Sequence, residues 1–167
     1  MKSTVTMLVC WLLGELSCLL HELGHAAGDR IGGSHSPWSI YVGSGPALLR
    51  IGRLRFRLIP VGGYYIPEVE QTSTKGAILM LAGGPLVSLL LTLLFGILRF
   101  LVFPSAAAEN SLIDLHDLSA FFFLWNLFQF LSTAIPMRYH IVCPGLDSDG
   151  KQILTLLRTR RNNVVTK

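Results

Sequence analysis

One stretch of the chain decides the fold: residues 4–28, which read TVTMLVCWLLGELSCLLHELGHAAG. It is mostly apolar and long enough to cross the hydrocarbon core of a bilayer as a helix, which takes about 20 residues. Ionisable side chains are costly inside a membrane span and usually serve a function there. His21, Glu22 and His25 therefore indicate a working site within the membrane.

The spacing of the two histidines suits a metal ion. His21 and His25 are four residues apart, so on a helix they lie on one side, about 6 Å apart along the axis, and both imidazoles can reach one ion. Glu22 lies beside them and can act as general base toward an attacking water molecule, the arrangement of zinc hydrolases. This pattern predicts a zinc protease embedded in a membrane.

The remaining composition predicts a membrane protein built from helices. The 167 residues are 51% hydrophobic and 14% charged, and the mean hydropathy is +0.53. Residues 76–98 and 118–137 are further apolar stretches without a charged side chain. We therefore expect one domain, residues 1–167, with three transmembrane helices at about 4–28, 76–98 and 118–137. Gly24 and Gly28 should let another helix approach the first span closely, with Gly83-Gly84-Pro85 as its partner surface.

Basic residues are distributed unevenly along the chain. They gather between the first two spans and after the third, whereas residues 104–117 contain acidic residues and neither lysine nor arginine. By the positive-inside rule the N-terminus is outside, and residues 29–75 and the C-terminus are cytoplasmic. We expect an integral multi-pass protein of the plasma (inner) membrane. This topology accounts for the net charge of +4, so no nucleic-acid partner is needed.

Residues 29–75 favour a small sheet at the membrane interface. Trp38–Val42 is a short β-rich run, and Gly43–Pro46 predicts a turn. Residues 53–58 then alternate strictly between arginine and apolar side chains. The arginines could face lipid phosphates, or the strand could be half-buried in a cytoplasmic subdomain, and periodicity alone does not choose. A short amphipathic helix is predicted to begin near Asp149 at the C-terminal end.

A catalytic zinc site takes three protein ligands and leaves a position for water, so a third ligand is required. His116 is on the expected outer side of the membrane, and His35 lies in an expected surface loop. Cys143 has no recognisable ligand spacing. Composition and spacing leave three residues unresolved, namely Asp149, Asp147 and His140.

Several short motifs resemble those of one known family. They are His21-Glu22-Leu23-Gly24-His25, residues 59–64 (IPVGGY), Ala82-Gly83-Gly84-Pro85, Ile135-Pro136 and Ser148-Asp149-Gly150. The chain resembles a minimal core of the site-2 protease family of intramembrane zinc metalloproteases. The resemblance implies one zinc ion per chain held by His21, His25 and Asp149, with Glu22 as the general base. It also implies that the substrates are membrane proteins or peptides.

The chain departs from that family at two positions. Thr133 and Ser88 stand where the family has asparagines, whose amides could orient substrate or stabilise the oxyanion. We expect Thr133 and Ser88 to take part of that role. The departures leave an alternative open, in which a catalytically weak relative serves as a membrane adaptor or immunity factor. A metal transporter that uses the same histidines is a further alternative.

Overall fold

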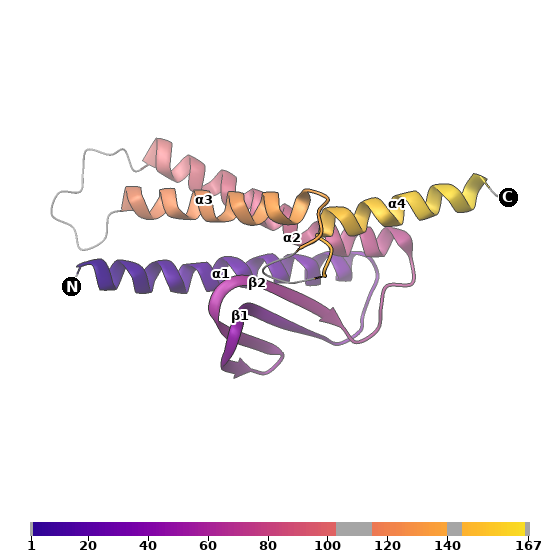
Figure 1. The fold of residues 1–167 in the computed structure, drawn as a ribbon, viewed down its shortest axis with the longest axis horizontal. Helices are drawn as coiled ribbons and strands as arrows, with labels where there is room; N and C mark the ends of the chain where they lie inside the picture. The colour runs from indigo at the N-terminus through magenta and orange to yellow at the C-terminus, as the bar shows by residue number, and fades with distance from the viewer. Residues whose placement is uncertain (1, 103–114, 140–144, 166–167) are drawn as a thin grey trace.

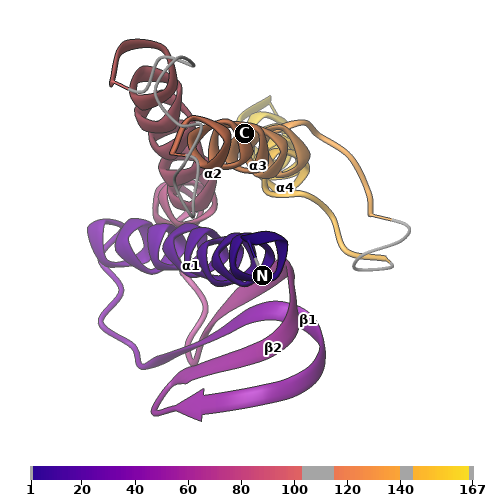
Figure 2. The same cartoon turned by 90° about the vertical axis from the view of Figure 1, so that its left-hand side faces the viewer.

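The structure is a computed structural model that describes residues 2–102, 115–139 and 145–165. Three helices run along its long axis, α1 and α3 in one direction and α2 in the other, and α4 extends beyond them (Figure 1). A two-stranded antiparallel sheet lies on the opposite side of α1 from α2 and α3 (Figure 2). The elements are α1 (Lys2–Ile31), β1 (Trp38–Ile51), β2 (Leu54–Pro67), α2 (Thr74–Ile97), the π-helical turn η1 (Leu98–Val102), α3 (Leu115–Ala134) and α4 (Asp149–Val165).

Two of the described helices are long and apolar enough to cross a membrane. They comprise Thr4–Ile31 and Thr74–Leu101, in agreement with the spans expected at 4–28 and 76–98. The stretch expected at 118–137 also forms a helix, α3, but it is not among the helices that meet this measure. Polar side chains interrupt it, including Asn126 and Gln129, and lower its hydropathy. It ends at Ala134, earlier than expected, because Pro136 disfavours helical backbone in the residue before it.

Glycines bring α1 and α2 into close contact, as expected. A Cβ atom at Gly24 would lie 2.5 Å from the carbonyl oxygen of Gly83, and one at Gly28 would overlap the carbonyl oxygen of Leu79. Because neither glycine has a side chain, the two backbones can touch. The contact places the histidines of α1 directly against α2.

The sheet is more strongly bent than the sequence predicts. Ile40 pairs with both Tyr65 and Leu54, and Ile40 N–H donates to the Arg53 carbonyl at 3.0 Å. Each strand therefore bends back, so that its two halves become separate segments of the sheet. The four segments lie side by side in the order 63–67, 38–42, 54–57 and 47–51. At Gly43–Pro46, where a turn was predicted, the chain does bend back, but β1 continues through the bend as one strand.

Glycines explain why the strands bend at this point without ending. Gly43 and Gly45 have φ values of +76° and +78°, which bend β1, and Gly62 bends β2 in the same way at +76°. The chain reverses again between the two strands at Gly52, where φ is +58°. The bends curl the sheet around the side of α1.

The apolar side of the sheet packs on α1. Ile40 and Val42 are completely buried against Cys18, and Leu19 and Leu23 of α1 pack around them. Two hydrogen bonds reinforce this contact: Trp11 Nε1 donates to the Leu58 carbonyl at 2.7 Å, and Cys18 Sγ donates to the Pro60 carbonyl at 3.1 Å. The sheet is thus held along α1 over several helical turns.

A buried carboxylate at the end of α1 ties down the last part of β2. Asp29 accepts hydrogen bonds from the Tyr65 hydroxyl at 2.7 Å and from Gln71 Nε2 at 2.8 Å. Burial, together with the hydrogen bond to Asp29 and its negative charge, raises the pKa of Tyr65, so the phenol remains a donor. This contact fixes the end of β2 next to the histidines.

Candidate metal centre

The two histidine rings of α1 are held by hydrogen bonds from their inner nitrogens. His21 Nδ1 lies 2.8 Å from Ser88 Oγ, and His25 Nδ1 lies 2.8 Å from the Met80 carbonyl oxygen, both on α2. Because a carbonyl only accepts, His25 Nδ1 carries the proton and its Nε2 presents a lone pair. The two Nε2 atoms are 3.3 Å apart.

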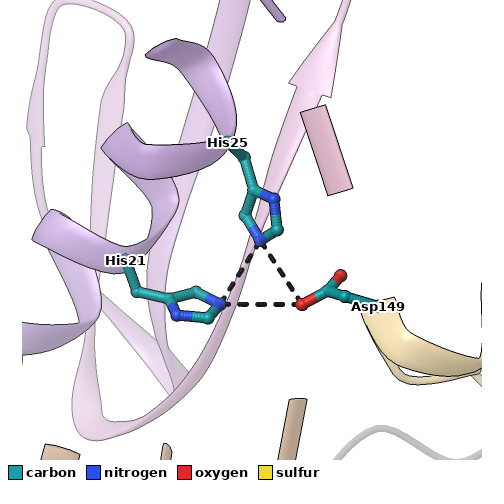
Figure 3. Close-up of side chains that lie close together, drawn as sticks. All are labelled: His21, His25 and Asp149. Atoms are coloured by element: carbon teal, nitrogen blue, oxygen red, sulfur yellow. Dashed lines mark hydrogen bonds and ion pairs between the residues drawn. The ribbon is translucent and has the colours of Figure 1, made fainter. Parts of the chain in front are cut away.

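Asp149 completes a cluster of three possible ligands. Its Oδ2 lies 3.8 Å from His21 Nε2 and 3.6 Å from His25 Nε2, as Figure 3 shows. The carboxylate belongs to the first turn of α4, where the exposed N–H groups of the helix favour negative charge. Residues 21 and 149, far apart in sequence, thus meet at one point of the described structure.

Residues on either side of Asp149 dock the start of α4 on the end of α3. The buried Ser148 hydroxyl donates to the Ile135 carbonyl at 2.7 Å and accepts from the N–H groups of Met137 and Lys151 at 3.0 and 3.2 Å. At Gly150 any Cβ atom would overlap the Ala134 carbonyl oxygen. The serine and the glycine therefore explain how the aspartate between them reaches the histidines.

The cluster fits a divalent metal ion. Tetrahedral zinc with bonds of 2.0–2.2 Å separates its ligand atoms by roughly 3.4 Å, and the three separations here are 3.3, 3.6 and 3.8 Å. Gly84 leaves the space beside the rings free, because a Cβ there would lie 2.7 Å from His21 Nε2 and even closer to His25 Nε2. Two imidazoles and a carboxylate form the donor set of a zinc hydrolase.

Glu22 lies beside this cluster without belonging to it. Its side chain is buried, and the backbone of Tyr65 in β2 hydrogen-bonds its carboxyl group. A Cβ at Gly63 would lie 2.8 Å from Glu22 Oε1, so the glycine makes room for the carboxyl group. The second oxygen, Oε2, is buried without a hydrogen-bond partner among the described residues and is available to a bound molecule.

Glu22 and the three cluster residues line one cavity of about 630 Å³. One wall is the end of β2, residues 60–65, and the facing wall is a side of α3. Since residues 63–67 pair with β1 on one side only, β2 presents a free strand edge to the cavity. The lining residues of α3 are Trp125, Phe128, Gln129, Leu131, Ser132 and Thr133.

The other candidates for the third ligand are placed differently. Asp147 also lines the cavity, but it pairs with Lys151 Nζ at 2.9 Å and lies 3.9 Å from Arg138 Nε. His35 is exposed and outside the cluster. His140 and Cys143 lie outside the described residues. Of the two aspartates that the spacing left open, only Asp149 joins the histidines.

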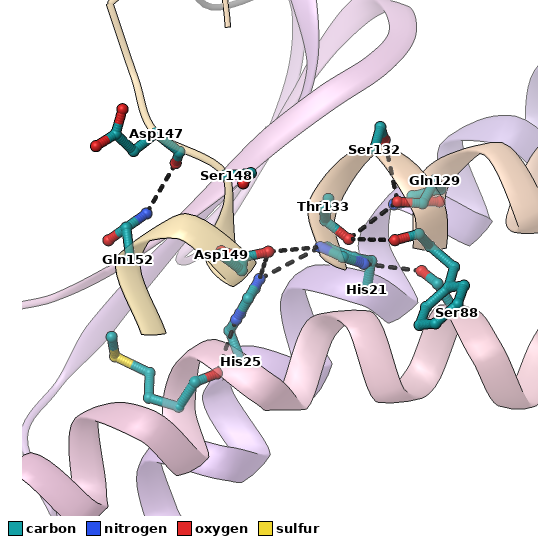
Figure 4. Close-up of polar contacts among 12 residues, drawn as sticks. His21, His25, Ser88, Gln129, Ser132, Thr133, Asp147, Ser148, Asp149 and Gln152 are labelled. Atoms are coloured by element: carbon teal, nitrogen blue, oxygen red, sulfur yellow. Dashed lines mark hydrogen bonds and ion pairs between the residues drawn. The ribbon is translucent and has the colours of Figure 1, made fainter. Parts of the chain in front are cut away.

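The two hydroxyl residues predicted to handle substrate lie in different surroundings. Thr133 lines the cavity, and its Oγ1 donates to the Gln129 carbonyl at 2.9 Å (Figure 4). Ser88 is completely buried and hydrogen-bonds the inner nitrogen of His21. Ser88 therefore contacts the cluster of possible ligands through a histidine, whereas Thr133 faces the cavity.

The sequence did not single out Gln129, which lines the cavity one helical turn before Thr133. Its Oε1 is buried without a hydrogen-bond partner in the described part of the chain. A primary amide offers both a donor and an acceptor, which match the two polar groups of a peptide bond. The sequence could have pointed to Gln129 because it is a polar residue in an otherwise apolar stretch, four residues before Thr133.

Two membrane-length helices and a cluster of two buried histidines and a half-buried aspartate beside a glutamate define a metallopeptidase-type protein. The chain belongs to peptidase family M50, the site-2 protease family, whose family model matches residues 11–164. Members of this family are zinc metallopeptidases and are typically associated with membranes. None of the curated protein sequences compared with the chain matches it.

Proposed function

We propose that this chain is an intramembrane zinc metalloprotease that hydrolyses peptide bonds of membrane-associated or transmembrane substrates. One observation carries the proposal: His21, His25 and Asp149 converge within a cavity that also contains the Glu22 carboxyl group. The cavity adjoins two helices that are apolar enough to span a membrane. Membership of peptidase family M50 supports the same function.

In this proposal His21, His25 and Asp149 hold the zinc ion, and Ser88 and the Met80 carbonyl keep the two rings oriented. When bound, the ion supplies Lewis acidity toward the substrate carbonyl and the attacking water. Glu22 accepts a proton from that water and later transfers it to the leaving amine. The N–H group of Tyr65 holds the Glu22 carboxyl group in place for both transfers.

We further propose three membrane spans, formed by α1, α2 and α3, in the plasma membrane. Opposite directions of successive helices support this arrangement, since α1 and α3 run one way and α2 the other (Figure 1). The clustering of arginine and lysine in residues 29–75 and after α3 supports an external N-terminus and a cytoplasmic C-terminus. The catalytic site then lies toward the cytoplasmic end of α1.

A transmembrane substrate must lose its helical structure near the cleaved bond, because an intact helix shields its carbonyl groups. The free edge of β2 along the cavity offers unpaired backbone groups to such an extended segment. A model transmembrane peptide with a glycine pair near its cytoplasmic end should therefore be cleaved faster than one with leucines there.

The function is tested on detergent-purified protein. The metal content of each variant and its rate of cleavage of this peptide are measured. His21→Ala and Asp149→Ala should lose the metal. Glu22→Gln should keep it but lower the cleavage rate by at least about a hundredfold, the usual contribution of a general base. Glu70→Gln, which changes an exposed carboxylate in the same way, should behave as wild type.

Three results would contradict the proposal. Metal retained by Asp149→Ala would refute the ligand set. Full metal content without cleavage of any membrane peptide would favour a membrane adaptor or immunity factor. Zinc uptake into vesicles that persists in Glu22→Gln would indicate transport, because transport needs no general base.

A further inference from the structure

The outward side of the sheet carries a row of aromatic and cationic side chains. The strand register places Tyr64, Tyr41, Arg55 and Arg50 side by side across the four segments. The rings of Tyr41 and Tyr64 stack with their centroids 4.6 Å apart, and the Arg55 guanidinium lies 4.7 Å from the Tyr41 ring centroid. Arg55 also hydrogen-bonds the Tyr41 hydroxyl. These contacts hold the row together.

Two more arginines flank this row on the same side of the sheet, because residues two apart in a strand share a face. Arg57 donates to the Tyr64 hydroxyl at 3.1 Å, and the Arg53 guanidinium lies 5.9 Å from the Trp38 ring centroid. Arg50 and Arg53 are exposed, and Arg55 and Arg57 are half-buried. We refer to Arg50, Arg53, Arg55 and Arg57 together as the arginine face.

The charges of the arginine face are not balanced within the described residues. Each ion pair in the described part of the chain involves a different cation. None of them joins a carboxylate to one of these four guanidinium groups. Arg50 and Arg55 stand directly opposite each other in the register, and like charges in that position destabilise a sheet. An anion bound between them would remove the repulsion. Guanidinium groups bind phosphates well because their planar N–H donors match two phosphate oxygens.

Large apolar side chains are exposed on the same outer segment as Arg50, and two of them, Leu49 and Ile51, project from the other side of the sheet. Leu48, Leu49 and Ile51 in the outer segment of the sheet are 51%, 54% and 57% exposed. The hydrogen bond from Trp11 to the Leu58 carbonyl ties β2, the neighbour of this outer segment, to α1, a helix of membrane-spanning length. Arginines and exposed leucines together suit the boundary between headgroups and acyl chains.

We propose that the arginine face binds the phosphate headgroups of anionic phospholipids, while the neighbouring leucines and isoleucine enter the acyl region. A soluble polyanion would satisfy the arginines but would leave those apolar side chains in water. The proposal rests on the membrane insertion in the proposed function, but not on the metal or on peptide hydrolysis.

Native mass spectrometry of the detergent-solubilised protein tests the proposal by titration with phosphatidylglycerol or phosphatidylcholine. A variant with Arg50→Gln, Arg53→Gln and Arg55→Gln is compared with one carrying Arg158→Gln, Arg160→Gln and Arg161→Gln, which removes three exposed charges from α4. Wild type and the α4 variant should bind phosphatidylglycerol at least tenfold more tightly than phosphatidylcholine. The sheet variant should lose this preference, since each arginine near a headgroup contributes about fivefold in affinity.

A third variant, with Arg50→Lys, Arg53→Lys and Arg55→Lys, keeps the charge and should retain most of the preference. Equal losses in the sheet and α4 variants would show a general charge effect and overturn the proposal. Displacement of phosphatidylglycerol by millimolar inorganic phosphate would overturn it in favour of a soluble ligand. Lipid binding as expected without any peptide cleavage would refute only the proposed protease activity.

Discussion

At the scale of single residues, Ser88 stands where the family has an asparagine, and its shorter side chain still contacts the site. A comparison of motifs predicted a substrate-handling role there, but the hydroxyl group hydrogen-bonds His21 Nδ1 and is completely buried. The Thr92 hydroxyl donates to the Ser88 carbonyl at 2.8 Å, one turn further along α2. A partner at Nδ1 sets the direction of the lone pair on Nε2, so Ser88 orients the His21 ring.

Removal of this hydroxyl should weaken metal binding. Ser88→Ala is expected to lower metal affinity by about tenfold or more, the usual effect of losing a group that orients a ligand. Competition with a chelator of known affinity measures the change. Thr92→Ala removes a buried hydroxyl from the same helix without touching either histidine and should keep the wild-type affinity. Equal affinities for Ser88→Ala and wild type would show that the ring is held by packing alone.

At the scale of helices, the site depends on how the start of α4 meets the end of α3. Helix α4 begins with Asp149, whose neighbours Ser148 and Gly150 both contact the last residues of α3 or the chain just after it. Pro136 ends α3 and lets the chain turn back toward the histidines. The pair Asp-Gly is thus required by geometry: the carboxylate reaches the cluster only because the next residue lacks a Cβ.

Gly150→Ala tests this contact between helices. The added methyl group would overlap the Ala134 carbonyl oxygen and push α4 away from α3, which moves Asp149 away from His21 and His25. Metal content should fall to less than half, while helix content by circular dichroism stays unchanged. The matched variant Thr155→Ala, at an exposed position of α4, should keep its metal. A fully loaded Gly150→Ala protein would rule out close docking of α4.

At the scale of the whole molecule, α1 is the central element. The sheet packs on one side of it and α2 and α3 on the other (Figure 2). The cavity is bounded by parts of all these layers and by the start of α4. The number of helices that cross the membrane then decides on which side of it each end of the chain lies.

The proposed three spans place the two termini on opposite sides of the membrane, whereas two spans would place them on the same side. Protease added to intact cells should remove an epitope tag from the N-terminus and leave one at the C-terminus. Lysed cells, as the control, should lose both tags. If both tags are protected or both removed in intact cells, α3 does not cross the membrane.

The first two long helices and the His-x-x-x-His pair follow from the sequence alone. Local hydropathy and a four-residue spacing are enough for these predictions, since both depend on neighbours within a few helical turns. The same local information placed a turn at Gly43–Pro46, where the structure has a bent strand. Glycines with positive φ serve turns and strand bends equally well, so local sequence could not distinguish the two.

By itself, then, the sequence determined the apolar helices, the paired histidines, the adjacent glutamate and the presence of a cationic strand. Composition and spacing left Asp149 and Asp147 open and only the family resemblance favoured Asp149, whereas the tertiary structure brings Asp149 to the histidines. The tertiary structure alone gave Ser88 its histidine partner and aligned Arg50 with Arg55. Each of these outcomes depends on which backbones can approach each other closely. That approach is controlled by packing between distant segments, above all at Gly24, Gly28 and Gly150, and it leaves no periodic signal in the residues that it brings together.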